Sequence, residues 1–235
     1  MELVLNFLCV AVLVLFWFGH RKHALFSAGS AVICYALALA LAIVISAPLG
    51  NVVDKQLVSP PIQAQAASDI ADMYSVEHKD SPADTLKQVP MKELLVDKPT
   101  SFAALADRYQ QMPKTLWNAY QKGGEQAFLD TLTGGLSYAI SRSVVFVVMF
   151  VLLAVLFRLI SKRIESNLPL ASKQQRWKQP LSMLLGLLVG FIMVEAAALI
   201  LSWLVPYGAG AVLFLDNEAW QRSWLYQFSP LLWWV

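Results

Sequence analysis

Apolar residues gather along the chain in four long runs that are almost free of charged side chains. They cover residues 3–19, residues 25 to about 46, a third stretch that starts between residues 136 and 144 and ends near residue 160, and residues 181 to about 204. About 20 apolar residues in a helix cross the ~30 Å hydrocarbon core of a bilayer. Because a helix satisfies its own backbone polar groups in lipid, the pattern predicts an all-α polytopic membrane protein with four transmembrane helices.

Prolines and glycines mark the expected ends of these spans. The second run reaches Pro48 and Gly50, and Pro206 follows the fourth run. Both residue types commonly end helices, so we expect the second span to stop at Pro48. The chain then divides into a transmembrane hairpin at residues 1–50, an insertion at 51–135, a second transmembrane hairpin at 136–206 and a tail at 207–235.

Charged residues are scarce in the chain, and their order around the first run is informative. They make up 14% of the 235 residues, whereas a soluble domain has about a quarter, so the apolar runs are not the core of a soluble protein. Glu2 precedes the first run, and Arg21 and Lys22 follow it. A cleaved signal peptide has the opposite order, and we therefore expect residues 3–19 to remain as a span.

The distribution of basic residues predicts the side of the membrane that each loop occupies. The short loop after the first run holds Arg21 and Lys22, and residues 158–178 include 6 basic residues and 1 acidic residue, a net charge of +5. The insertion has 8 basic and 11 acidic residues, a net charge of −3. Basic loops stay in the cytoplasm, so we expect the insertion and both termini on the extracytoplasmic side.

The insertion combines short amphipathic stretches with frequent prolines. The spacing of its apolar residues predicts a helix at residues 63–74 and another that starts at Ser101, while residues 75–99 are expected to be irregular. Gly123 and Gly124 should break the helical pattern before the third span. The apolar stripes of the insertion are too narrow for a deep core, so we expect a small helical extracytoplasmic cap that leans on the membrane surface or on another subunit. The alternative is a partly ordered loop without a partner.

Aromatic residues dominate the tail. Trp220, Trp224 and Phe228 recur at four-residue spacing, and Asp216 and Glu218 interrupt the apolar run. A fifth span would have to bury those charges, so the sequence favours a short helix lying along the outer leaflet at the membrane interface. A fifth or re-entrant span is the alternative.

Motifs of soluble enzymes are missing from the sequence. It contains no glycine-rich phosphate loop, no HExxH, no CxxC and no GxSxG, and its three histidines are scattered. Cys9 and Cys34 both fall within apolar runs, where a small buried hydrophobe is the favoured interpretation. We therefore expect no enzymatic activity, no metal, no cofactor and no nucleic-acid partner.

Glu195 is the acidic residue that lies deep within an apolar run. A carboxylate there is costly unless it is paired or protonated, and Arg142, near the start of the third span, lies within ~5 Å of the expected depth of Glu195. We expect the two side chains to form an intramembrane pair. A structural lock between the third and fourth spans is favoured over a proton or ion path, because one acid and one base fall short of a relay.

Three further residues are candidates for helix packing. Gly186 and Gly190 form a GxxxG motif, which lets another helix approach closely and gives weaker support for a homodimer. Asn6, in the first span, can hydrogen-bond across helices. The alternative for Asn6 is a position close enough to the outer interface to find water.

Parts of the chain resemble the colicin V production family. The resemblance rests on Asn6, on GHRK at residues 19–22 followed by LFS at 25–27, and on the segments FVLLAVLFRLISKRIESNLPL at 150–170 and LSMLLGLLVGFIMVEAAALIL at 181–201. It covers the four spans and leaves the insertion and the tail unmatched. The family commonly has Asp at the position of Asn6 and Gly at that of His23, so a role of that Asp does not carry over.

Two functions remain open at this point. The resemblance implies a non-enzymatic multi-pass protein of the bacterial plasma membrane that supports toxin production or export, or envelope homeostasis. We expect it to work in an assembly, as a homo-oligomer or with a membrane-protein partner that binds the insertion. The alternative is a small transporter or channel in which Glu195 and Arg142 lie on an ion or proton path.

Overall fold

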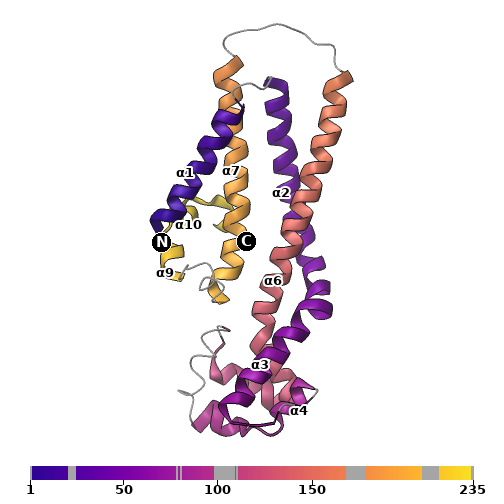
Figure 1. Ribbon diagram of the computed structural model, residues 1–235, viewed down its shortest axis with the longest axis vertical. Coiled ribbons are helices and arrows are strands. Elements are labelled where there is room, and N and C mark those ends of the chain that lie inside the picture. The colour runs from indigo at the N-terminus through magenta and orange to yellow at the C-terminus, as the bar shows by residue number, and fades with distance from the viewer. Residues whose placement is uncertain are drawn as a thin grey trace. The chain divides into compact units, whose positions relative to one another are not determined.

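A computed structural model of the chain is helical throughout its described parts. It describes residues 2–20, 25–77, 79, 81–97, 109, 111–167, 178–207 and 217–233. Every regular element in these ranges is an α-, 3-10 or π-helix and none is a strand (Figure 1). This confirms the all-helical prediction.

The chain divides into two compact units, each described by itself. The first unit consists of Met1–Ala47, Val145–Ser202 and Phe214–Val235, and the second of Pro48–Val144 and Trp203–Leu213. The first unit contains α1 (Glu2–Gly19), the N-terminal part of α2 (Leu25–Val53), the C-terminal part of α6 (Pro113–Asn167) and most of α7 (Lys178–Leu204). The second unit contains the remainder of α2 and α6 together with α3 (Ser59–Met73) and α4 (Pro82–Leu86).

Three helices in the described parts are long and apolar enough to cross a membrane. They cover Ser27–Met73, Pro113–Ile164 and Gln179–Tyr207, and the apolar helix Leu3–Gly19 is shorter. Large apolar side chains remain exposed along them, as at Leu152 and Leu159. Extended apolar surface of this kind suits lipid better than water, so the chain is a membrane protein.

The second apolar helix does not end where the sequence predicted. α2 continues through Pro48 to Val53, and the chain stays helical through the π-helix η2 (Asp54–Val58) into α3. A proline inside a helix removes one backbone hydrogen bond, but the turns on either side of Pro48 keep their own hydrogen bonds and α2 stays packed against α6 at Gly50. The prediction of a stop at Pro48 and Gly50 is therefore wrong.

Gly50 provides a close contact between helices instead of ending one. A Cβ atom on Gly50 would lie 3.1 Å from Cα and 3.4 Å from Cβ of Arg142 on α6. Ordinary contacts between carbon atoms are about 3.5–4.0 Å. The approach of α2 to α6 within the second unit thus depends on the missing side chain of Gly50.

The long helix α6 has one break, at its glycine pair. Pro113 suits the first position of the helix, because the N–H that proline lacks would have no partner there. Gly124 has φ 68° and ψ −154°, a conformation that residues with a side chain rarely adopt. The predicted break at Gly123 and Gly124 is confirmed.

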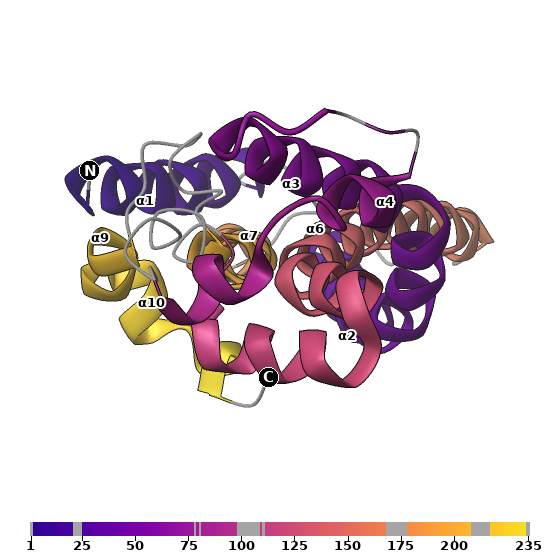
Figure 2. The same cartoon turned by 90° about the horizontal axis from the view of Figure 1, so that it is seen from below.

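The second unit has a buried core of its own. Figure 2 shows α3 and α4 next to each other in this unit. The core combines residues of these helices, of the π-helix η3 (Glu93–Asp97) and of the N-terminal half of α6. Its members are Ala66, Ala67, Ile70, Leu86, Val89, Met91, Leu94, Leu95, Tyr109, Leu116, Phe128, Leu129 and Leu132. The expectation that the narrow apolar stripes of the insertion leave it without a deep core is wrong, because stripes from separate helices combine in this cluster.

The predicted elements of the insertion have mixed outcomes. The helix predicted at residues 63–74 is confirmed by α3, which ends one residue earlier, at Met73. The stretch at 75–99, expected to be irregular, contains α4 and η3 in its described part. The helix predicted from Ser101 lies outside the described residues.

The tail consists of three short elements and not of one short helix. α9 (Asn217–Arg222) and α10 (Trp224–Phe228) are followed by the 3-10 turn η5 (Pro230–Trp233). Ser223 divides the two helices with an extended backbone, and its hydroxyl oxygen accepts a hydrogen bond from the N–H of Tyr226. Serine favours such a capping role over a position inside a helix. The four-residue spacing of the aromatic residues did not reveal this break between the two helices.

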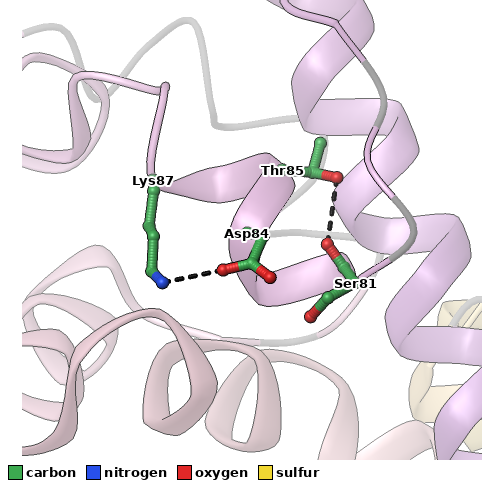
Figure 3. A network of polar contacts seen from close by, with 4 residues as sticks. All are labelled: Ser81, Asp84, Thr85 and Lys87. Atoms are coloured by element: carbon green, nitrogen blue, oxygen red, sulfur yellow. Dashed lines mark hydrogen bonds and ion pairs between the residues drawn. The ribbon is translucent and has the colours of Figure 1, made fainter.

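A small polar network within residues 79–87 stabilises the turn that contains α4 (Figure 3). The hydroxyl of Thr85 lies 3.1 Å from the carbonyl oxygen of Ser81, to which it donates, and accepts from the N–H of Lys79 at 3.0 Å. At the surface, Lys87 Nζ lies 2.7 Å from Asp84 Oδ1, and this hydrogen bond lowers the pKa of the Asp84 carboxyl below its usual value. Exposed ion pairs add little stability, so the buried hydroxyl of Thr85 is the more important contact.

Replacing Thr85 by valine should destabilise this turn by about 1–2 kcal/mol, because the N–H of Lys79 loses its acceptor. The measurement is the rate of tryptic cleavage after Lys79 and Lys87 in the full-length protein, which should rise. Thr115→Val, at an exposed position of α6, is the matched control and should leave the rate unchanged. Equal rates for Thr85→Val and the wild type would contradict this role of the hydroxyl.

Candidate functional site

Glu195 is buried in α7 and is bonded to the tail. It is 3% exposed and precedes the end of the helix at Leu204 by nine residues, which corresponds to ~14 Å along the axis. The hydroxyl of Ser229 donates to Glu195 Oε2 at 2.5 Å, and the backbone of Leu231 provides a second hydrogen bond. The carboxylate that the sequence singled out therefore receives both of these bonds from the end of the tail.

Asn6 makes a second polar contact with the tail. It is 9% exposed in α1, and its Oδ1 accepts a hydrogen bond from the backbone N–H of Trp224 at 2.9 Å. This N–H lies in the first turn of α10, where the helix itself offers no acceptor. Asn6 thus satisfies a group at the start of α10, as a capping residue would, but from a distant part of the chain.

Two apolar side chains of the tail are buried, whereas Trp224 is 57% exposed. Trp220 is 2% and Leu225 6% exposed, and the rings of Trp220 and Tyr226 meet edge-on with their centroids 5.6 Å apart. Figure 1 shows α9 and α10 beside the N-terminal end of α1. We call this contact the tail-binding site. It comprises Asn6 and Glu195 on the helices and Trp224, Ser229 and Leu231 on the tail.

The two glycines of the GxxxG motif lie against α1. A Cβ atom on Gly186 would be 2.5 Å from the carbonyl oxygen of Phe16, and one on Gly190 would be 3.3 Å from Cα of Leu13. Ser182, one turn before Gly186, donates its hydroxyl to the carbonyl oxygen of His20 at 2.8 Å. These contacts place α1 directly against α7, so the acceptors Asn6 and Glu195 belong to one packed helix pair.

Arg142 has an aromatic partner within the second unit. Its guanidinium carbon lies 4.2 Å from the ring centroid of Trp203, a cation–π contact, and its Nε has no hydrogen-bond partner among the described residues. Glu195 belongs to the first unit. The pairing of Arg142 with Glu195 therefore stays a prediction.

The chemistry of the tail-binding site is hydrogen bonding. It offers one carboxylate, one amide and one hydroxyl, and in the described part of the chain no three His, Cys, Asp or Glu side chains gather as metal ligands would. Cys9 and Cys34 are both free thiols, and Cys34 donates to the carbonyl oxygen of Phe157 at 3.4 Å.

Sequence reasoning found both acceptors of the site and missed their partners. Ser229 is a single hydroxyl in an apolar stretch, and nothing in its spacing connects it with Glu195. Trp224 contributes a backbone N–H, which no pattern of side chains reveals. Its indole suggested an interfacial anchor instead.

Comparisons with protein-family models, curated proteins and solved structures give no match to this chain. The resemblance to the colicin V production family therefore stays a prediction based on the residues quoted above. The same holds for the function that it implies.

Glu195→Ala removes the acceptor of two tail hydrogen bonds and should release the tail. A hydrogen bond contributes about 0.5–1.5 kcal/mol, so we expect the loss of two to accelerate hydrogen–deuterium exchange of residues 217–233 roughly 5- to 100-fold. Glu195→Gln keeps an oxygen acceptor in the same place and should change exchange much less. If exchange in Glu195→Ala matches the wild type, other contacts hold the tail.

Proposed function

We propose that this protein is a non-enzymatic, multi-pass protein of the bacterial plasma membrane that presents a folded helical domain outside the membrane. In this proposal it works in an assembly that supports toxin production or export, or envelope homeostasis. The observation that carries the proposal is the buried core of the second unit. A loop that only connects two spans needs no core, whereas a segment with its own core has the anatomy of a domain.

Exposed apolar side chains on this domain support a binding role. Met112 is 74% exposed, and Met73 and Val96 are nearly half exposed. Methionine adapts readily to different partner surfaces. The proposed partner is a second copy of the chain or another membrane protein.

Four transmembrane helices with both termini outside remain our proposal for the topology. α1 has 18 residues, or ~27 Å of helix, close to the ~30 Å of the hydrocarbon core. The two short loops with an excess of basic residues then lie in the cytoplasm. The acidic insertion lies on the opposite side.

We further propose a re-entrant tail in place of an interfacial one. Ser229 bonds to Glu195 at a level ~14 Å before the end of α7, which is deeper than a helix lying among the headgroups. The same bond supports a structural role for Glu195 over a place on a proton path. The contact of Arg142 with Trp203 likewise supports a structural role for Arg142.

Cysteine labelling tests the topology. In a background without Cys9 and Cys34, single cysteines at Lys92, Lys173 and Gln227 would be exposed to a membrane-impermeant maleimide on intact cells. Lys92→Cys should react, Lys173→Cys should react only after permeabilisation, and Gln227→Cys, two residues before Ser229 in the re-entrant tail, should be protected from the reagent on both sides. The reverse pattern would overturn the proposed orientation.

Purification from native membranes tests the assembly. The full-length protein should yield a stoichiometric partner or homo-oligomer, and Met112→Glu should reduce its recovery because a charge would replace an exposed apolar contact. Gln121→Glu, at another exposed position of α6, is the matched control. The proposal fails if the wild-type protein is a monomer without a partner, or if Met112→Glu and other charged substitutions on the second unit do not reduce recovery of the partner or oligomer.

A flux measurement tests the alternative of a transporter. The proposal also fails if proteoliposomes show an ion flux that is lost in folded Glu195→Ala protein, a result that favours transport.

A further inference from the structure

A groove in the first unit has basic side chains at one end and apolar walls elsewhere. It measures 360 Å³ and is lined by α6 together with Tyr35 of α2 and Met193 of α7. Its α6 residues include Val151, Val155, Arg158 and Lys162, which recur at the spacing of one helix face. The groove therefore follows the axis of α6.

Arg158 is fixed at the basic end of the groove by α2. Its Nη1 donates to the carbonyl oxygen of Ser27 at 3.2 Å, and its Nη2 donates to the Ser27 hydroxyl at 3.2 Å. Lys162 follows one turn later on α6 and is exposed. Among the side chains that the structure describes, which exclude that of Glu165, neither cation forms an ion pair with a carboxylate. The basic end of the groove thus carries two positive charges, and no described carboxylate neutralises them.

The groove has the length of one bilayer leaflet. From Val151 to Lys162 the helix rises ~17 Å, and half of the hydrocarbon core measures ~15 Å. Val151 is 52% and Val155 55% exposed, so the apolar wall opens sideways towards the lipid. A molecule from the surrounding bilayer can enter without leaving the membrane.

We infer that this groove binds an anionic glycerophospholipid of the surrounding bilayer. Its phosphate lies between Arg158 and Lys162, and one acyl chain follows Val151, Val155 and Met193. The charge favours an anionic lipid, because a zwitterionic headgroup brings an ammonium group that opposes the two cations. The basic end lies in the cytoplasmic leaflet if the proposed topology holds, but the binding itself depends on neither the topology nor the assembly.

Native mass spectrometry of the detergent-solubilised full-length protein tests this inference. Titration with phosphatidylglycerol should give clearly tighter binding than titration with phosphatidylethanolamine. The double variant Arg158→Gln/Lys162→Gln should weaken phosphatidylglycerol binding roughly 10- to 30-fold, because it removes two cations near the headgroup. Arg163→Gln removes an adjacent exposed cation that does not line the groove, and it should have little effect.

The acyl-chain part of the inference has its own variant. Val151→Trp should fill the groove and weaken phosphatidylglycerol binding, whereas Val148→Trp, on an exposed α6 position outside the groove, should not. If loss of the Ser27 bonds prevents Arg158→Gln from folding, Lys162→Gln and Val151→Trp decide the matter. Equal affinity for the two lipids, or equal effects of Arg163→Gln and Lys162→Gln, overturns the inference. Strong competition by inorganic phosphate alone shows a site for free anions and overturns it as well.

Discussion

Glu195 interrupts the apolar sequence of α7, and a carboxylate buried among helices needs hydrogen-bond donors to offset its lost hydration. The other side chains around it in sequence are apolar, so these donors have to come from elsewhere in the chain. The hydroxyl of Ser229 and the backbone of Leu231 provide them. Asn6 has the complementary need, since its buried amide oxygen requires a donor and takes the N–H of Trp224. The position of the tail follows from these two acceptors.

Much of the helical architecture can be predicted from the sequence, because it depends on local patterns. Length and hydropathy predict α7 closely, and the glycine pair at 123 and 124 predicts the break in α6. The prediction fails at Pro48, where the rule for isolated helices gives way to the tertiary packing of α2 against α6 at Gly50. It also fails for the core of the second unit, since Ile70, Leu94 and Phe128 come together only through tertiary packing.

The candidate site also combines residues that the sequence predicts with partners that only the tertiary structure shows. Glu195 and Asn6 are conspicuous because a polar residue in an apolar run is rare, and the sequence identifies both. Their partners on the tail are a lone hydroxyl and a backbone N–H, which carry no pattern of their own. The glycines can likewise be identified in the sequence, but their contacts cannot. Gly50 and Gly186 are visible in the sequence, but only the structure shows that one meets Arg142 and the other the backbone of Phe16.

The bond between Asn6 and Trp224 joins two segments that the ribosome makes far apart in time. α1 and α7 are synthesised before the tail, so Asn6 and Glu195 lack these hydrogen-bond donors while the apolar helices are already being inserted. A contact of such long sequence separation forms late, because its loop-closure entropy has to be overcome first. The first unit therefore acquires its final packing only after translation has passed Leu231. Until then its interior holds an acid without these donors.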